Sequence, residues 1–344
     1  MLENYTQESM QIGIDILENE ILEQYPDVLP NLLRDHTTQK NIFWATDNYN
    51  HLGSQYNFNS EILPELITGE NGNIIMPRVH KDKILQQARS KEMAEVFTPS
   101  WICNAQNNLI DNAWFGREGV FNIELIDSEK FRWTTNVEKI TFPEGKTYKN
   151  YIKDTRLEMA CGEAPYITSR YDSTTGDFIP IENRIGLLDR KLRVINENVD
   201  DSGEWLEAAQ TAYKNTYAFE WQGDSLLLAR EAMLITFIEN YIYKFNKEPL
   251  LKSIDFIAYI ISWNVWQMDG LKAVIPNSCG INETNVLDIF GTLESKECEG
   301  CKISKIDKHN GIYSLIKDWS NKDFETGRNG RKIRFVDLIK SKKA

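Results

Sequence analysis

The chain has 344 residues, 41% of them apolar and 26% charged, which is enough for one large core or a domain with an extension and excludes disorder as the default state. Its formal net charge of −12 excludes a protein that coats nucleic acid over its whole surface, because phosphate neutralisation needs clustered Lys and Arg. Five scattered cysteines exclude the dense, even disulfide framework of a small secreted domain and predict reduced thiols.

Neither a membrane segment nor a secretory leader is apparent in the sequence. No apolar run approaches the roughly 20 residues that a spanning helix needs. The first residues also lack a basic region followed by an apolar one. We therefore expect a cytoplasmic protein with no membrane partner.

Residues 1–90 are predicted to form a helical and irregular N-terminal extension. Apolar residues recur at helical spacing up to Pro26, whereas residues 37–72 are rich in Asn, Tyr, Gly and Ser. A helix is predicted over 81–95, and a second helix after Thr98 or Ser100, either of which can cap it. The soft boundary near residues 85–95 separates this extension from the rest.

Residues 91–290 are predicted to form an α/β domain with its sheet flanked by helices. A short strand is predicted just before Arg156, and a second one over 218–221 precedes a long helix over 225–245. Residues 254–266 are almost continuously apolar and must be buried, as a helix or a strand. Residues 291–344 form a basic C-terminal segment, with twelve Lys or Arg against five Asp or Glu from Lys302 onward.

The turn after the first strand carries an acid-x-small-x-Gly-x-small pattern, formed by Glu158, Ala160, Gly162 and Ala164. In an open α/β sheet, ligands bind at the carboxyl ends of the strands. A glycine there lets the backbone approach the ligand, and an acid after the next strand accepts hydrogen bonds from a ribose. Glu220 is the acid in that second position.

These motifs resemble those of the N6-adenine DNA methyltransferases, especially the methylase subunits of restriction-modification systems. The Glu158–Ala164 turn is similar to the family's cofactor loop, although Ala164 stands where a second glycine is usual. The segment Glu95-Val96-Phe97-Thr98-Pro99 resembles the Thr-Pro element that packs on the methionine part of the cofactor. Ala218-Phe219-Glu220 resembles the ribose-binding segment, and Asn264 to Leu271, with Asp269, resembles the segment at the adenine ring.

The resemblance implies a Rossmann-like fold that binds S-adenosylmethionine (SAM) and acts on DNA, alone or with a second methylase or specificity subunit. It assigns cofactor contacts to Thr98, Pro99, Glu158, Ala160, Gly162, Glu220 and Asp269. It implies direct methyl transfer to the adenine amino group of a flipped base. It covers roughly residues 85–280.

One departure affects catalysis. The family binds the adenine amine with an Asn/Asp/Ser-Pro-Pro-aromatic loop, and this tetrapeptide does not occur in the sequence. Asn264-Val265-Trp266 keeps an amide and an aromatic ring without the prolines, so Asn264 is the candidate for amine contact. Three alternatives stay open: a diverged loop, a loop supplied by a partner, or a non-catalytic SAM-binding scaffold or regulatory subunit. RNA or a small molecule as the methyl acceptor is a further alternative.

Each motif also has an ordinary structural role. Thr98-Pro99 is a common helix start, Glu220 is a favourable acid before a helix, and Asp269-Gly270 is a common turn pair. The dense charges of residues 166–217 fit a substrate-facing insertion and an internal network of ion pairs equally well.

The basic C-terminal segment and the cysteines before it suggest two further sites. Cys298 and Cys301 have the spacing of half a tetrahedral zinc site, for which Cys279 and His309 are conceivable further ligands. No metal is the primary expectation, and zinc on these cysteines is the alternative. The residues Arg328, Arg331, Lys332 and Arg334 form either a solvated surface or a contact to DNA phosphates.

Overall fold

A three-stranded parallel sheet organises the computed structural model, which describes residues 18–81, 83–92, 97–126, 131–280, 282–287, 293–324, 327 and 329–340. Its strands, β5 (Arg156–Met159), β6 (Thr216–Glu220) and β7 (Val265–Gln267), lie in the order β5-β6-β7. Glu158 pairs with Ala218, and Ala218 pairs with Val265. Since all three strands are parallel, their carboxyl ends meet at one edge of the sheet.

Two pairs of helices connect these strands. The helices α7 (Leu187–Asn198) and α8 (Ser202–Lys214) lie between β5 and β6, and α9 (Gly223–Phe245) and α10 (Leu251–Asn264) lie between β6 and β7. The long helix predicted over 225–245 is confirmed as α9. The apolar stretch 254–266, predicted to be a helix or a strand, is part helix and part strand, because α10 passes directly into β7.

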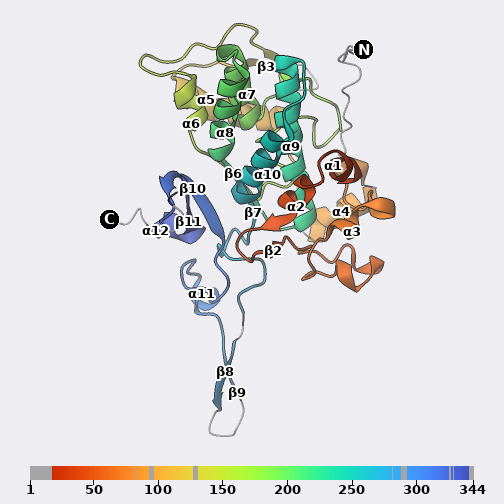
Figure 1. The fold of residues 1–344 in the computed structure, drawn as a ribbon. Coiled ribbons are helices and arrows are strands. Elements are labelled where there is room, and N and C mark those ends of the chain that lie inside the picture. The colour runs from red at the N-terminus through yellow and green to blue at the C-terminus, as the bar shows by residue number, and fades with distance from the viewer. Residues whose placement is uncertain are drawn as a thin grey trace.

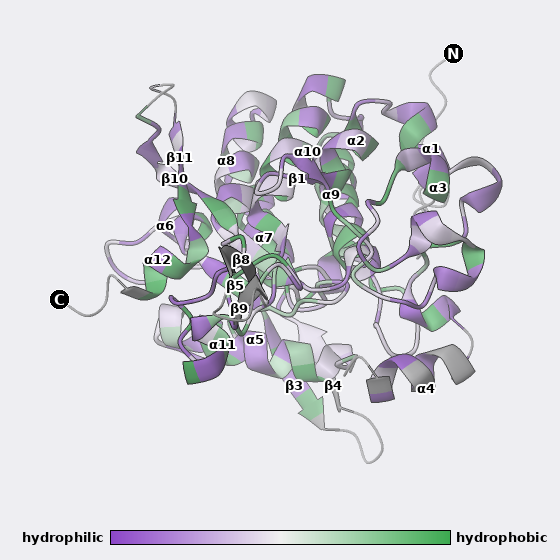
Figure 2. Cartoon of the chain, turned by 90° about the horizontal axis from the view of Figure 1, so that it is seen from below, coloured by the Kyte–Doolittle hydropathy of each residue, from purple (hydrophilic) through white to green (hydrophobic). Residues whose placement is uncertain are grey.

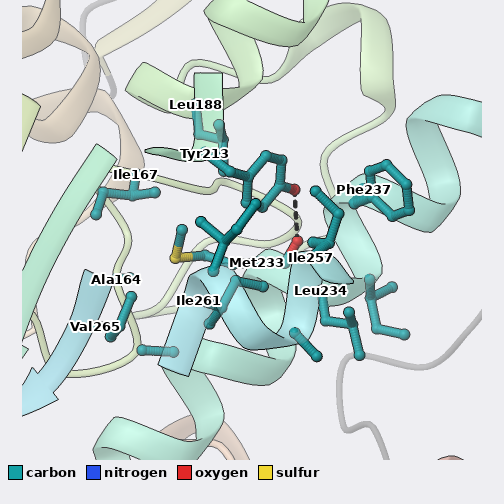
Figure 3. Packing of buried hydrophobic residues seen from close by; sticks show 14 of the residues in the cluster. Ala164, Ile167, Leu188, Tyr213, Met233, Leu234, Phe237, Ile257, Ile261 and Val265 are labelled. Atoms are coloured by element: carbon teal, nitrogen blue, oxygen red, sulfur yellow. Dashed lines mark hydrogen bonds between the residues drawn. The ribbon is translucent and has the colours of Figure 1, made fainter. Parts of the chain in front are cut away.

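The main core lies between these helices and one face of the sheet (Figure 3). Ala164 and Val265 contribute from the sheet side, and Met233 and Ile261 contribute from α9 and α10. The buried Tyr213 hydroxyl donates to the Met233 carbonyl at 2.8 Å. Coloured by hydropathy, the helices carry alternating hydrophobic and hydrophilic bands, as expected when one side of each helix packs inward (Figure 2).

The opposite face of the sheet is covered by the C-terminal segment. Strands β10 (Leu315–Lys322) and β11 (Asn329–Arg334) form an antiparallel hairpin that is followed by α12 (Phe335–Lys340). Phe219 and Trp266 pack there with Ile316 and Val336 in a small second core. Neighbouring strand residues point to opposite faces, so Ala218 and Phe219 belong to different cores.

The predicted N-terminal extension joins the main core and is not a separate body. It contributes helices α1 (Glu18–Gln24), α2 (Val28–Leu33) and α3 (Pro64–Ile67), strands β1 (Arg34–Asp35) and β2 (Lys40–Asn41), and 3-10 turns η2 (Asn50–Leu52), η3 (Ser54–Tyr56), η4 (Gly69–Asn71) and η5 (Arg78–His80). Residues from Ile21 to Ile75 share one core with α9. The buried Arg230 of α9 donates to the carbonyls of Leu32, Arg34 and Val265. The boundary near residues 85–95 therefore does not separate two cores.

The helices predicted on either side of the Thr-Pro element are confirmed as α4 (Lys83–Glu92) and α5 (Ser100–Phe115). The residue before α5 is Pro99, and neither Thr98 nor Ser100 caps the helix through its side chain. The remaining elements are β3 (Asn122–Ile126), β4 (Phe131–Thr135), α6 (Tyr148–Lys153), η6 (Ile181–Asn183), β8 (Asn282–Leu287), β9 (Leu293–Lys296) and α11 (Glu299–Ile303). The hairpin β8–β9 projects away from the body (Figure 1).

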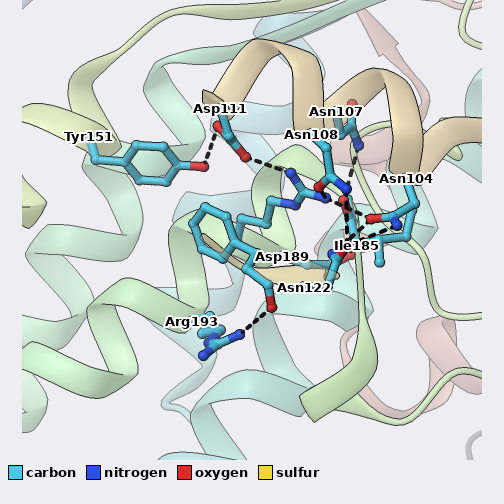
Figure 4. Close-up of polar contacts among 12 residues, drawn as sticks. Asn104, Asn107, Asn108, Asp111, Asn122, Tyr151, Ile185, Asp189 and Arg193 are labelled. Carbon is cyan, nitrogen blue, oxygen red and sulfur yellow. Dashed lines mark hydrogen bonds and ion pairs between the residues drawn. The ribbon is translucent and has the colours of Figure 1, made fainter. Parts of the chain in front are cut away.

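Internal pairing engages three of the arginines of residues 166–217. Arg190 donates to Asp111 at 2.6 Å and to Asn104 at 2.9 Å, within a polar network that ties α5 to α7 (Figure 4). Arg170 and Arg184 both pair with Glu239 of α9, at 2.9 and 2.6 Å.

The predicted mixed α/β class is confirmed. The Rossmann-like architecture stays a prediction, because the parallel sheet of the described residues has three strands and β5 pairs on one side only. Among these residues, none of the helices combines the length and the apolar character needed to cross a bilayer.

Candidate functional site

Glu158, in β5, is a buried carboxyl group near the carboxyl edge of the sheet. Its side chain is 8% exposed, and its Oε1 accepts a long hydrogen bond of 3.4 Å from the Tyr166 amide. Its Oε2 is buried and has no hydrogen-bond partner among the described residues. Burial raises the pKa of Glu158 to about 8, because water no longer stabilises the charged form. Binding of a cation beside Oε2 would offset that cost.

The turn after β5 has left-handed backbone at three alternate residues. Ala160, Gly162 and Ala164 have φ of +52°, +54° and +58°. This conformation is costly for a residue with a Cβ atom and is tolerated by glycine. The acid-small-Gly-small pattern thus corresponds to a special backbone shape, although glycine occupies only one of the three positions.

Glu220 connects the turn to the next strand. Its Oε2 accepts from the Gly162 amide at 2.8 Å, and its Oε1 accepts from the Gln222 amide at 3.2 Å. Burial raises the pKa of Glu220, and these backbone donors act in the opposite direction. Two acidic groups with raised pKa values therefore lie at adjacent strand ends.

The predicted Thr-Pro element lies beside this turn. A Cβ atom added at Gly162 would be 4.0 Å from the Phe97 ring. The Thr98 side chain interacts with Tyr166, the residue whose amide reaches Glu158. Pro99 precedes α5 directly. Glu95 and Val96, which complete the predicted element, lie outside the described residues.

A buried ion cluster at the start of α9 was not predicted from the sequence. Asp224 is fully buried and contacts Arg89 at 2.9 Å, the Tyr49 hydroxyl at 2.8 Å and Lys81 at 3.6 Å. Arg89 and Lys81 hold the pKa of Asp224 well below its usual range despite burial, which acts against them. Arg89 also donates to Gln222 at 2.9 Å, next to Glu220. The cluster therefore fixes the N-terminal segments against the candidate site.

Asp269 follows β7 but is occupied by its own turn. Its Oδ1 accepts from the amides of Leu271 and Lys272 at 3.0 and 3.2 Å, and its Oδ2 lies 3.5 Å from the Lys272 amine. This is the ordinary Asp-Gly turn that the dipeptide also predicts. A contact from Asp269 to a ligand stays a prediction.

The structure argues against Asn264 as the amine-binding residue. Asn264 is the last residue of α10 and precedes β7, so it lies at the amino end of that strand and not at the candidate site. Its amide nitrogen donates to the carbonyls of Tyr213 and Thr216, and its oxygen accepts from the Trp319 ring at 2.7 Å. All its polar atoms are used in holding the fold, a role that the sequence pattern does not reveal.

Two cavities lie near the sheet. A pocket of about 10 Å³, lined by Glu163 and Pro165, lies beside the turn. A cleft of about 1480 Å³ lies elsewhere, between the amino ends of the strands and the β10–β11 hairpin. Its lining includes four lysines and several aromatic rings. Neither cavity is lined by Glu158 or Glu220, the two buried acids of the candidate site.

The residues that the sequence suggests as alternative metal ligands also come together, in a part of the chain after the three strands. Cys298 and Cys301 lie with Cys279 and His309 in one group of potential ligand atoms.

Comparison of the chain with family models, with characterised proteins and with solved structures found no match.

Proposed function

We propose that this chain is the cofactor-binding part of a SAM-dependent DNA adenine-N6 methyltransferase, as an enzyme or as the methylase subunit of a restriction-modification system. The observation that carries the proposal is the pair Glu158 and Glu220, two buried carboxyl groups at adjacent carboxyl ends of parallel strands, joined by the Gly162 turn. Buried acids with raised pKa values concentrate at functional sites.

Bound SAM would supply an activated methyl group. Glu158 has a buried oxygen without a partner among the described residues and would stabilise the positively charged amino-acid end of the cofactor. Glu220 would accept hydrogen bonds from ribose hydroxyls with its remaining lone pairs, since a carboxylate accepts up to about four. Thr98, Pro99, Ala160, Gly162 and Asp269 would give supporting contacts.

One edge of β5 pairs with no other strand among the described residues. In doubly wound sheets, ligands bind where the strand order reverses. The order β5-β6-β7 runs in one direction, so a reversal would require a further strand beside β5. We therefore propose that another chain or segment completes the cofactor site at β5, which is the split-enzyme alternative raised by the missing Pro-Pro loop.

The cleft at the amino ends of the strands supports DNA as the partner. Lys153, Lys214, Lys317 and Lys332 line it, and the Lys317 amine lies 4.9 Å from the centres of the Tyr259 and Trp263 rings. Lysines neutralise the phosphates of a nucleic acid. Asp318 and Asp323 also line the cleft, so its charge is mixed.

A non-catalytic SAM-binding scaffold is the second candidate function. It is favoured by the engagement of Asn264 in structural hydrogen bonds and by the absence of a Pro-Pro loop from the sequence. In that case the cofactor would be a structural ligand, and a partner would perform the chemistry or none would occur.

Calorimetric titration with SAM tests the proposal. The intact chain should bind SAM, and Glu158→Gln should weaken binding by roughly 10- to 150-fold, because one buried charged contact is worth about 1.5 to 3 kcal/mol. The matched control is Glu204→Gln, which removes an exposed acid of α8 and should bind as the parent chain does. Equal affinity in the parent and in Glu158→Gln would contradict the site.

Transfer of labelled methyl groups to duplex DNA separates the two candidate functions. Transfer by the chain alone, or after addition of a second subunit, would support the enzyme. Saturable SAM binding without transfer in either case would support the scaffold.

A further inference from the structure

We propose that Cys279, Cys298, Cys301 and His309 form a structural zinc site at the base of the β8–β9 hairpin. The three thiol sulfurs and the Nδ1 atom of His309 all lie within 4.8 Å of one another. Cys279 precedes β8, and Cys298 follows β9 and begins α11. The four residues therefore bring together both ends of the hairpin and the loop after α11.

The spacing matches a tetrahedral zinc ion. Zinc–sulfur bonds of about 2.3 Å and zinc–nitrogen bonds of about 2.0 Å place tetrahedral ligand atoms roughly 3.5 to 3.8 Å apart. In the structure, the sulfurs of Cys279 and Cys301 are 3.7 Å apart. The His309 Nδ1 atom lies 3.8, 3.4 and 3.6 Å from the sulfurs of Cys279, Cys298 and Cys301.

Neither a disulfide nor a hydrogen-bonded thiol cluster fits this arrangement as well as a metal ion does. A disulfide requires a sulfur–sulfur distance of about 2.05 Å, and all three cysteines are free thiols. A hydrogen-bonded cluster is also inadequate, because one ring nitrogen has a single proton or lone pair for three thiols. A shared cation satisfies all four groups, and the thiols would release their protons to solvent on binding it.

The surrounding backbone is shaped to keep the four groups close. A Cβ atom at Gly300 would lie 2.6 Å from the His309 backbone nitrogen, and one at Gly311 would lie 2.8 Å from the Cys279 Cβ atom. The Asn310 amide donates to the Cys298 sulfur at 3.4 Å, as amides do around metal-bound thiolates. The His309 amide donates to the Tyr313 hydroxyl at 2.8 Å.

The number of ligands and the small size of the nearby second core indicate a structural zinc site and not a catalytic one. Four protein ligands close a tetrahedral site and leave no position for a substrate, in contrast to catalytic zinc sites. Within the described part of the chain, the second core has only six buried residues and must hold the C-terminal segment and its projecting hairpin. A metal commonly replaces core packing where apolar burial is this small.

Elemental analysis of the purified full chain should find one zinc ion per molecule. The same chain refilled with Co²⁺ should show the visible bands of tetrahedral cobalt and a thiolate-to-cobalt charge-transfer band. The double variant Cys298→Ser/Cys301→Ser should weaken zinc binding by about tenfold or more, because the ion loses two of its four ligands. Cys103→Ser, which changes a buried thiol of α5, should retain the metal.

His309→Cys tests the zinc site even if the double variant does not fold. It preserves four ligands and should retain zinc, whereas His309→Ala should not. Removal of zinc from the unmodified chain with a chelator should speed proteolysis between Cys279 and Cys298 and leave the main core intact. A folded chain that takes up no zinc or cobalt, or a double variant that binds zinc as tightly as the parent, would overturn the site.

Discussion

The two ends of the parallel sheet differ in the sign and in the burial of their charged side chains. At the carboxyl ends, Glu158 and Glu220 are buried beside the Phe97–Thr98 segment and have raised pKa values. At the amino ends, lysines line an open cleft of about 1480 Å³. The same three strands thus carry a buried acidic site at one end and, at the other, an open cleft whose lining has four lysines and the two acids Asp318 and Asp323. A small cation fits the first, and a polyanion fits the second.

The largest expected effect comes from breaking the ion cluster that closes the carboxyl ends. Asp224→Ala would leave Arg89 and Lys81 without their buried counter-charge. Loss of one partner from a buried ion pair costs about 3 to 5 kcal/mol of unfolding free energy. Chemical denaturation followed by circular dichroism measures the change. Asp200→Ala is the control, because the Asp200 carboxylate is exposed and pairs with Lys244 at the surface. Equal stability of the two variants would show that the cluster does not hold the site together.

The second prediction concerns the pH dependence that buried Glu158 imposes. Its pKa of about 8 exceeds the ordinary value, so the folded chain binds a proton that the unfolded chain has released. Stability should therefore fall as pH rises through the window from the ordinary carboxyl pKa up to about 8. Glu158→Gln removes this cost and should stabilise the chain at pH 8 by roughly 1 to 3 kcal/mol, with little gain near pH 4.

The same group links pH to cofactor binding. A cation beside Glu158 favours its charged form, so SAM binding should release a proton and tighten between pH 6 and pH 8. Calorimetry in buffers of different ionisation enthalpy measures the released proton. A pH-independent affinity in the parent chain, or an unchanged pH slope in Glu158→Gln, would contradict the assignment.

The difference between the two ends also shows what the sequence can reveal. The turn after Glu158, the strand at Glu220 and the helix after it were predicted, because apolar periodicity and glycine act locally. The first strand was predicted just before Arg156, whereas β5 begins at that residue. The ion cluster around Asp224 was missed, since its partners Tyr49, Lys81 and Arg89 are far away in the chain and have no common pattern.

Asn264 illustrates the opposite error. The partial similarity of Asn264-Val265-Trp266 to the family's Asn-Pro-Pro-aromatic loop suggested a substrate contact, but a buried amide is more often bonded to the backbone. Tyr213 and Thr216 supply those partners from another helix and strand. The zinc ligands fall between these cases, because the Cys298–Cys301 spacing was visible in sequence, whereas the approach of Cys279 and His309 depends on the folded loop.

The third prediction concerns the lysines that line the cleft at the amino ends of the strands. Lys153 and Lys332 are exposed lysines that line the cleft. Lys153→Ala/Lys332→Ala should weaken DNA binding by roughly three- to tenfold and reduce the salt slope by about two, because two phosphate contacts are lost. Fluorescence anisotropy at several salt concentrations measures both quantities. Lys247→Ala, which changes an exposed lysine just after α9 that does not line the cleft, should leave both quantities unchanged.

The smallest expected effect separates backbone shape from side-chain contact within the turn itself. Gly162→Ala places a Cβ atom at φ +54° with only the Phe97 ring in ordinary contact at 4.0 Å, so its cost of about 1 kcal/mol should be conformational. Ala160→Gly relaxes a residue at φ +52°, and the gain should nearly cancel the entropy cost of glycine. Denaturation of both variants measures this contrast. Because Gly162 also donates to Glu220, a cofactor affinity that falls only in Gly162→Ala would indicate that the turn positions Glu220, whereas parallel losses in both variants would indicate that the turn itself contacts the ligand.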